Sequence, residues 1–135
     1  MIMPVVAACI HSDKNYDEVL LTKRRSDYKE TNGKWEFCGG RVEEGEGLEE
    51  ALKREIFEEL KLDIQAGNLV HAQINKYAYS HDRFLVLYYN CLSYKPINEE
   101  SLPEHIWVNA QDIAAYDCLP GTIEAVRRIF WREDR

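Results

Sequence analysis

The hydrophobic residues of this chain gather in short runs separated by polar turns, a pattern that predicts a sheet of several strands. The first two runs, Val5–Ile10 and Glu18–Lys23, flank a polar stretch and are interpreted as a hairpin. The string FLVLYYNCL is nearly all apolar, which favours a central strand buried on both faces. The later strands are expected at Lys34–Cys38, Val70–Tyr79, Arg83–Leu92 and Glu104–Val108.

Two segments show helical periodicity. Between Leu48 and Leu60 the apolar residues recur every four positions, which predicts an amphipathic helix with one buried stripe. That stripe consists of Leu48, Leu52, Ile56 and Leu60, with Ala51 beside them. A second amphipathic helix is expected at Thr122–Trp131, and Asn109–Tyr116 is expected to be a loop or a helical turn. No repeat or linker interrupts the chain, so one domain is predicted over residues 1–135.

The composition excludes several classes of function. The formal net charge is −7, and a stable nucleic-acid complex usually needs a basic face, so none is expected. No apolar run approaches the ~20 residues of a membrane helix, and the apolar start lacks the basic residues of a signal peptide. The cysteines form no paired motif, which predicts reduced thiols in a cytoplasmic protein without a zinc site. They are Cys9, Cys38, Cys91 and Cys118.

Candidate chemistry is concentrated in the acidic segment Trp35–Leu62. Glu55, Glu58 and Glu59 are three or four positions apart, so their carboxylates project from one side of the predicted helix. Like charges at this spacing repel and do not stabilise the helix, whereas hard divalent cations prefer clustered carboxylate oxygens. A metal site that handles phosphate groups is therefore favoured over a merely solvated acidic helix.

The residues before this helix fit the same interpretation. Gly39 and Gly40 permit a tight turn and a close backbone approach, and a carbonyl there can serve as a further metal ligand. Glu46 lies at the start of the helix, where the helix dipole favours a carboxylate. Arg54 is expected to reach back to Glu46 and hold the loop against the helix.

These residues resemble the Nudix box, GX5EX7REUXEEXGU with U a bulky aliphatic residue, over positions 40–62. The chain departs from the pattern at Lys61, where the box has glycine. A glycine would suit a left-handed residue that closes the helix, so lysine is expected to cost about 1 kcal/mol or to shift the helix end. The matching positions are Gly40, Glu46, Arg54, Glu55, Ile56, Glu58, Glu59 and Leu62.

The resemblance implies an α+β fold, an α/β/α sandwich around a mixed β-sheet. It also implies hydrolysis of nucleoside diphosphates linked to another group, with Mg²⁺ (or Mn²⁺) as cofactor. The metal ligands it implies are Glu55, Glu58, Glu59 and the carbonyl of Gly40. The catalytic roles it implies fall on Glu55 as a candidate general base, Glu58 as a ligand, and Arg54 and Glu46 as orienting partners.

The string WEFCGGRVEEGE is similar to the entry strand of the MutT-like branch, with Cys38 in place of proline. That branch hydrolyses a nucleoside triphosphate, including modified or oxidised ones, to a monophosphate and pyrophosphate. Cys38 is interpreted as a packed side chain rather than a reactive thiol. The substrate contacts implied are Arg24, Arg41, Thr122 and Tyr79.

Several of these residues keep a second interpretation. Thr122 stands where the branch has a base-reading Asn or Asp, but a helix N-cap is favoured for it. The aromatic residues Tyr77, Tyr79 and Phe84 either stack a base or, as is favoured, pack within strands. The loop glutamates Glu99, Glu100 and Glu104 include a candidate for one more metal ligand, or are solvated.

Two alternative functions stay open at this stage. One is a Nudix hydrolase of dinucleoside polyphosphates, a branch in which a tyrosine near position 79 is expected, or of RNA 5′ ends. The other is a catalytically idle fold that binds nucleotides as a sensor. The partner expected in each case is a small nucleotide, with no membrane. The protein is expected to be a monomer or a homodimer, the latter through an exposed Trp131 and the apolar termini.

Overall fold

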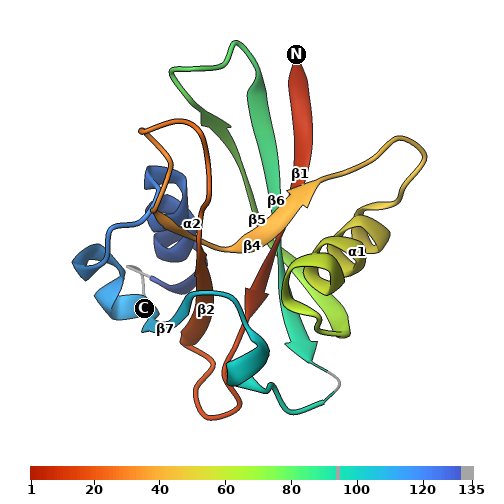
Figure 1. The fold of residues 1–135 in the computed structure, drawn as a ribbon, viewed down its shortest axis with the longest axis vertical. Helices are drawn as coiled ribbons and strands as arrows, with labels where there is room; N and C mark the ends of the chain where they lie inside the picture. Colours follow the sequence, from red (N-terminus) through yellow and green to blue (C-terminus); the bar gives the residue numbers. More distant parts are fainter. Residues whose placement is uncertain (94, 132–135) are drawn as a thin grey trace.

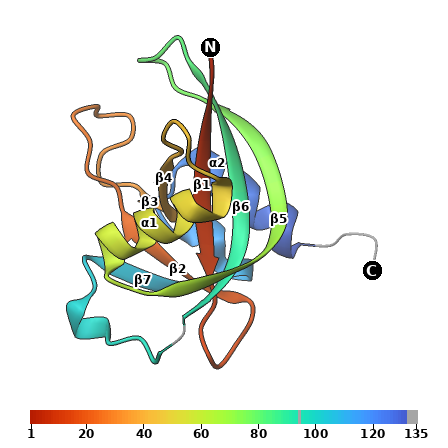
Figure 2. The same ribbon diagram turned by 90° about the vertical axis from the view of Figure 1, so that its right-hand side faces the viewer.

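A computed structural model describes residues 1–93 and 95–131 of the chain (Figure 1). Its centre is a four-stranded mixed sheet in the order β4-β1-β6-β5, in which β1 and β6 are parallel and the other pairs antiparallel. Helices α1 (Leu48–Leu60) and α2 (Pro120–Phe130) lie on opposite sides of this sheet (Figures 1 and 2). The four strands are β1 (Ile2–Ile10), β4 (Cys38–Arg41), β5 (Ile64–Lys76) and β6 (Arg83–Ser93).

A smaller antiparallel sheet in the order β3-β2-β7 completes the fold. Its strands are β2 (Glu18–Lys23), β3 (Trp35–Glu36) and β7 (His105–Asn109). Two short 3₁₀ helices flank β7, η1 (Glu99–Ser101) before it and η2 (Ala110–Ala115) after it. In the described part of the chain, no helix is long and apolar enough to cross a membrane.

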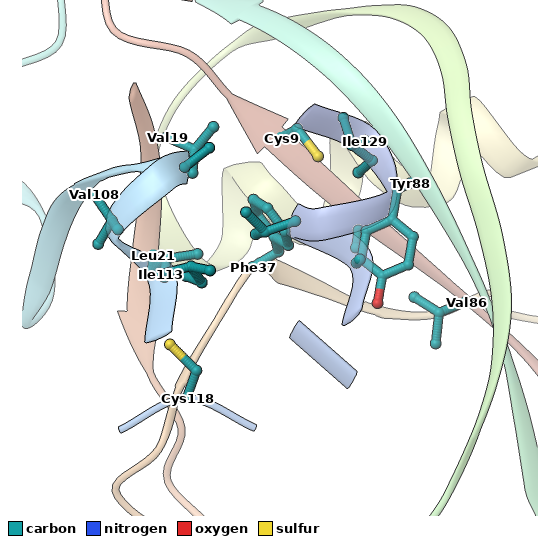
Figure 3. Close-up of a cluster of buried hydrophobic side chains, with 14 residues drawn as sticks. Cys9, Val19, Leu21, Phe37, Val86, Tyr88, Val108, Ile113, Cys118 and Ile129 are labelled. Carbon is teal, nitrogen blue, oxygen red and sulfur yellow. The ribbon is translucent and has the colours of Figure 1, made fainter. Parts of the chain in front are cut away.

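Strand β1 separates two hydrophobic cores because its side chains alternate between the faces of the sheet. Val6, Ala8 and Ile10 pack with the buried residues of α1. Ala7 and Cys9 pack on the other face with residues of α2. The second core also receives side chains from the smaller sheet and from β6, as Figure 3 shows. Both faces of the central sheet are therefore covered, and the predicted α/β/α sandwich is confirmed.

The predicted position of FLVLYYNCL is also confirmed. Strand β6 lies between β1 and β5. Val86 and Tyr88 enter the core beneath α2, while Tyr89 and Cys91 enter the core beneath α1. Only the end of the strand differs, because Leu92 is exposed.

The predicted hairpin between Val5–Ile10 and Glu18–Lys23 is wrong. Strand β1 already pairs with β4 on one edge and β6 on the other, so neither edge is free for β2. A single bridge between His11 and Val19 links the two segments before β2 enters the smaller sheet.

The predicted Gly39-Gly40 turn is wrong as well, since both glycines lie inside β4 and pair with β1. Positive φ angles among the described glycines occur only at Gly33 and Gly45. The close backbone approach explains the glycines instead. A Cβ on Gly39 would lie 1.9 Å from the carbonyl oxygen of Val6, and one on Gly40 would lie 2.3 Å from the carboxyl carbon of Glu55.

Most of the predicted helix stripe is buried, with one exception. Ala51, Leu52, Ile56 and Leu60 are buried, but Leu48 is 38% exposed. Leu48 is the first residue of α1, where the chain returns from a loop that extends away from the sheet (Figure 1).

The element boundaries shift in the second half of the chain. Strand β5 begins at Ile64 and ends at Lys76, so Tyr77 and Tyr79 lie in the loop before β6 and not in a strand. The segment predicted as a loop or helical turn forms η2. Trp131, predicted to be exposed, is half-buried against the core beneath α2, and its ring nitrogen donates to the carbonyl of Ala110 at 3.0 Å.

Lys61 closes α1 in the left-handed conformation, with φ 57° and ψ 30°. Its amide donates to the carbonyl of Phe57 at 3.0 Å, and its side-chain Nζ donates to the carbonyl of Glu58 at 3.1 Å. The helix therefore ends where the box glycine would end it, and the lysine adopts the backbone angles that suit glycine.

We expect Lys61→Gly to raise the free energy of unfolding by about 1 kcal/mol, because glycine adopts this conformation without a Cβ penalty. Urea unfolding would measure the gain. Lys61→Ala is the matched control, since it removes the same Nζ hydrogen bond but keeps the Cβ. Equal stability of the two variants would contradict the strain at this position.

Candidate active site

Arg54 is the centre of the acidic cluster on α1. Its Nε and Nη2 donate to the two carboxylate oxygens of Glu46 at 2.6 and 3.0 Å, a bidentate pair. Its Nη1 donates to Glu55 at 2.9 Å and to Glu58 at 3.4 Å. Its Nη2 also donates to the carbonyl of Arg41 at 3.0 Å. One guanidinium thus ties the helix to the preceding loop and to β4, and the predicted pairing of Arg54 with Glu46 is confirmed.

Glu46 is the carboxylate most strongly affected by this arrangement. Hydrogen bonds from Arg54 and from the amide of Glu43 lower the pKa of Glu46 to about 2. The same contacts raise the pKa of Arg54. Glu46 therefore remains ionised over the whole physiological pH range.

Strand β4 contacts the glutamates from the other side. Glu55 lies directly against the backbone of Gly40, where no side chain blocks it. Glu59 accepts a hydrogen bond from the Sγ of Cys38 at 2.8 Å. Partial burial raises the pKa of Glu59, and the neighbouring charges of Glu55 and Glu58 add to the effect.

The four cysteines are free and buried, as predicted for reduced thiols. Burial raises the pKa of Cys38, as does the adjacent Glu59 carboxylate. Its thiol therefore remains protonated and serves as a packed hydrogen-bond donor rather than a reactive nucleophile.

The described residues do not already form a metal cage: no group of three or more His, Cys, Asp or Glu side chains is arranged to hold an ion. The donor set nevertheless suits a hard divalent cation, because Glu55, Glu58 and Glu59 offer carboxylate oxygens from one side of α1. Burial and the charges of Glu55 and Glu58 both raise the pKa of Glu59, and a bound cation would favour its ionised form.

A cleft of about 480 Å³ opens beside this cluster, within the ~300–1,000 Å³ usual for small-molecule sites. The residues assigned to the substrate from the sequence all line it: Arg24, Arg41, Thr122 and Tyr79. Gly40, against which Glu55 lies, lines the cleft too, whereas Glu55, Glu58 and Glu59 are not themselves among the lining residues.

Aromatic rings and arginines form the outer part of this cleft. Tyr79 stacks on Tyr28 with ring centroids 3.8 Å apart and on Tyr77 with centroids 5.4 Å apart. The guanidinium of Arg24 lies 5.8 Å from the Tyr77 ring, and that of Arg41 lies 5.7 Å from the Phe84 ring. The predicted strand-packing role is therefore wrong for Tyr77 and Tyr79, whose rings line the cleft from a loop.

The predicted N-cap role of Thr122 is wrong. Leu119 is the residue at the N-cap of α2, and Thr122 lies inside the first turn of the helix. Its side chain is only 5% exposed and lines the cleft.

The loop glutamates lie elsewhere. Glu104 pairs with Lys23 and Arg25, and Glu99 accepts hydrogen bonds from the rings of His105 and Trp107. Neither these two nor Glu100 is among the residues that line the cleft.

Glu36 and Tyr28 are among the cleft residues that were not singled out from the sequence. Glu36 accepts a hydrogen bond from Arg24 at 3.1 Å, lines the cleft and lies close enough to Glu59 for their charges to interact. Burial raises the pKa of Glu36, although Arg24 opposes the shift. The sequence did hold a signal for Glu36, because this residue is a charged side chain inside the short apolar string WEF. For Tyr28, in a polar loop far from Tyr79 in sequence, no signal was available.

Comparison with known proteins agrees with this geometry. The NUDIX domain model matches residues 1–131. Nucleoside triphosphatase NudI of Escherichia coli is 31% identical over 140 residues, covering 91% of this chain and 93% of NudI.

Solved structures give the same result. The crystal structure of the MutT protein from Methanosarcina mazei covers 99% of this chain and 96% of its own, with a TM-score of 0.79 at 23% identity. The solution structure of a MutT protein from Staphylococcus aureus covers 96% of this chain and 95% of its own, with a TM-score of 0.69 at 28% identity. The chain belongs to the NUDIX domain family, and its likeness is to the MutT-like members. It is a Nudix hydrolase.

We expect the Arg54–Glu46 pair to make stability depend on pH. The pKa of Glu46 is lower in the folded protein than its ordinary value of 4.5, so its stabilising effect is present above that value and is lost as the pH falls toward 2. Urea unfolding of the wild type and Glu46→Gln at about pH 7, 4 and 3 would test this. The variant should be less stable at neutral pH, and the difference should narrow in acid.

Glu44→Gln provides the control for this experiment, because Glu44 is an exposed glutamate of the same loop. In Glu44→Gln the free energy of unfolding should depend on pH in the same way as in the wild type. A difference between Glu46→Gln and the wild type that is constant over the pH range would show that the ion pair does not act as described.

Proposed function

We propose that this Nudix hydrolase converts a nucleoside triphosphate, ordinary or modified, to a nucleoside monophosphate and pyrophosphate with Mg²⁺ (or Mn²⁺). The observation that carries the proposal is the continuity of one cleft. It runs from Gly40, whose backbone lies against Glu55, to the stacked rings of Tyr79 and Tyr28. The end at Gly40 would take the phosphates and the other end the base. The likeness to nucleoside triphosphatase NudI supports the same substrate class.

The phosphate end depends on the residues of the Nudix box. Glu55, Glu58, Glu59 and the carbonyl of Gly40 would hold the metal, which when bound polarises phosphate oxygens and stabilises the charge that develops on them. Glu55 is the candidate general base because its carboxylate adjoins the cleft wall at Gly40. Arg54 and Glu46 orient these carboxylates through the hydrogen bonds described above.

The other end of the cleft would hold the nucleoside. Tyr79 has a ring on which any base can stack once Tyr28, which covers one face of that ring, has moved aside. Thr122 also lines this cleft, as do Arg24, which pairs with Glu36, and Arg41, so positive charge lies beside it in a chain of net charge −7. We place the activity in the cytoplasm, where nucleoside triphosphates and reduced thiols occur together.

Product analysis on a panel of nucleotides with Mg²⁺ would test the proposal. The panel includes ordinary and oxidised triphosphates, diadenosine polyphosphates, capped RNA ends, ADP-ribose and nucleotide sugars. We expect monophosphate and pyrophosphate from a triphosphate. Preferred cleavage of a diadenosine polyphosphate would favour the alternative that Tyr79, now located in the cleft, keeps open.

We expect Glu58→Gln to lower turnover by at least about 100-fold while the fold survives, because it removes a carboxylate ligand, and loss of even an outer-shell partner costs 10- to 100-fold. Steady-state kinetics and thermal unfolding would measure both effects. Glu49→Gln, at an exposed position on the same helix, is the control. A wild-type protein that binds nucleotide without turning over any member of the panel would identify a sensor instead.

We expect Tyr79→Ala to raise KM about tenfold with a smaller change in kcat, because base stacking contributes about 1–3 kcal/mol per base. Tyr79→Phe keeps the ring and should retain the wild-type KM. Tyr116→Ala, which removes an aromatic ring that does not line the cleft, is the matched control. An unchanged KM in Tyr79→Ala would place the base elsewhere.

A further inference from the structure

Strand β4 and helix α1 face each other with matching spacings. Cys38 and Gly40 are two residues apart on β4, so they lie on the same face of the strand about 6.7 Å apart. Glu59 and Glu55 are four residues apart on α1, a rise of about 6 Å. Cys38 contacts Glu59 and Gly40 contacts Glu55. Each of the two glutamates therefore contacts a different residue of β4: Glu59 contacts the thiol of Cys38, and Glu55 contacts the backbone of Gly40.

The two partners act differently. At Gly40 the absence of a side chain leaves room for the carboxylate of Glu55. At Cys38 the Sγ donates a hydrogen bond to one oxygen of Glu59, Oε2, at 2.8 Å. That hydrogen bond fixes the direction of a long side chain that otherwise extends toward solvent, and it holds the carboxylate next to that of Glu55, with which Glu59 also interacts.

From these contacts we infer that Cys38 is a positioning residue, whose thiol orients Glu59 for binding the divalent cation. This inference rests on the proposed function, in which Glu59 is a metal ligand. Cys38 itself is 3% exposed and is packed in the core beneath α1, so it acts through Glu59 and does not reach the ion from solvent. A side chain that packs there without a donor would fill the core but leave Glu59 unoriented.

The test is Mn²⁺ binding measured by electron paramagnetic resonance on the full chain without nucleotide. We expect Cys38→Ala to weaken binding by about 3- to 10-fold, the effect of losing one ordinary hydrogen bond, because a thiol is a weak donor. Cys38→Ser keeps a donor and should stay within about twofold of the wild type. Cys91→Ala is the matched control, since Cys91 is a buried cysteine of the same core and should not change binding.

Kinetics gives a second measurement that a packing defect alone would not reproduce. We expect Cys38→Ala to raise the Mg²⁺ concentration needed for half-maximal activity by the same factor as the Mn²⁺ dissociation constant. The KM for nucleotide at saturating Mg²⁺ should stay unchanged, because Cys38 does not line the cleft.

Glu59→Gln separates failure of this inference from failure of the proposed metal site. If Glu59→Gln weakens Mn²⁺ binding but Cys38→Ala does not, the positioning role of Cys38 is overturned and the metal site stands. Equal losses in Cys38→Ala and Cys38→Ser would overturn it too, since the donor would then be irrelevant. If Glu59→Gln leaves binding unchanged, Glu59 is not a ligand and the inference about Cys38 is overturned, whereas the proposed hydrolysis is decided separately by the product analysis.

Discussion

The hydrogen bonds of Arg54 are the interaction on which the candidate site depends. Three carboxylates project from one side of α1 and repel one another, and a fourth, Glu46, is brought to them by the preceding loop. The single guanidinium satisfies several of these groups at once and also reaches the carbonyl of Arg41. Without the Arg54 guanidinium, the loop that carries Glu46, helix α1 and edge strand β4 would share no hydrogen-bond donor. The planar fork of arginine suits this role, because lysine cannot bond two oxygens of one carboxylate in the same way.

The sandwich supplies the rigid frame for this interaction. Strand β1 supports α1 through alternate residues and pairs with β4 along its edge, so the helix and the strand that face each other at the site share one support. The smaller sheet contributes β3, which carries Glu36, and places Arg24 beside the cleft. The site is thus assembled from two sheets and one helix, and its geometry follows from how they pack.

Local patterns in the sequence predicted the parts of the structure that depend on local physics. The period of Leu52, Ile56 and Leu60 located α1, and the positions of Glu46 and Arg54 predicted that these two residues pair. The false hairpin shows the limit of such patterns, because adjacent runs do not reveal that both edges of β1 are taken by distant strands. The same holds for the cleft. Tyr28 and Tyr79 are far apart in sequence, and only the packing of two loops brings their rings together.

The stack of Tyr28 on Tyr79 also bears on selectivity. Ring centroids 3.8 Å apart leave no space for a third ring, which would need about 7 Å, twice the contact distance of carbon atoms. A flat ligand that uses the face of Tyr79 covered by Tyr28 must first separate this pair. If Tyr79 receives the base as proposed, Tyr28 competes with the base for the same ring, and the affinity of the base reflects an exchange of one stack for another. On that proposal, a base with a larger ring face than tyrosine gains more by the exchange than a smaller one.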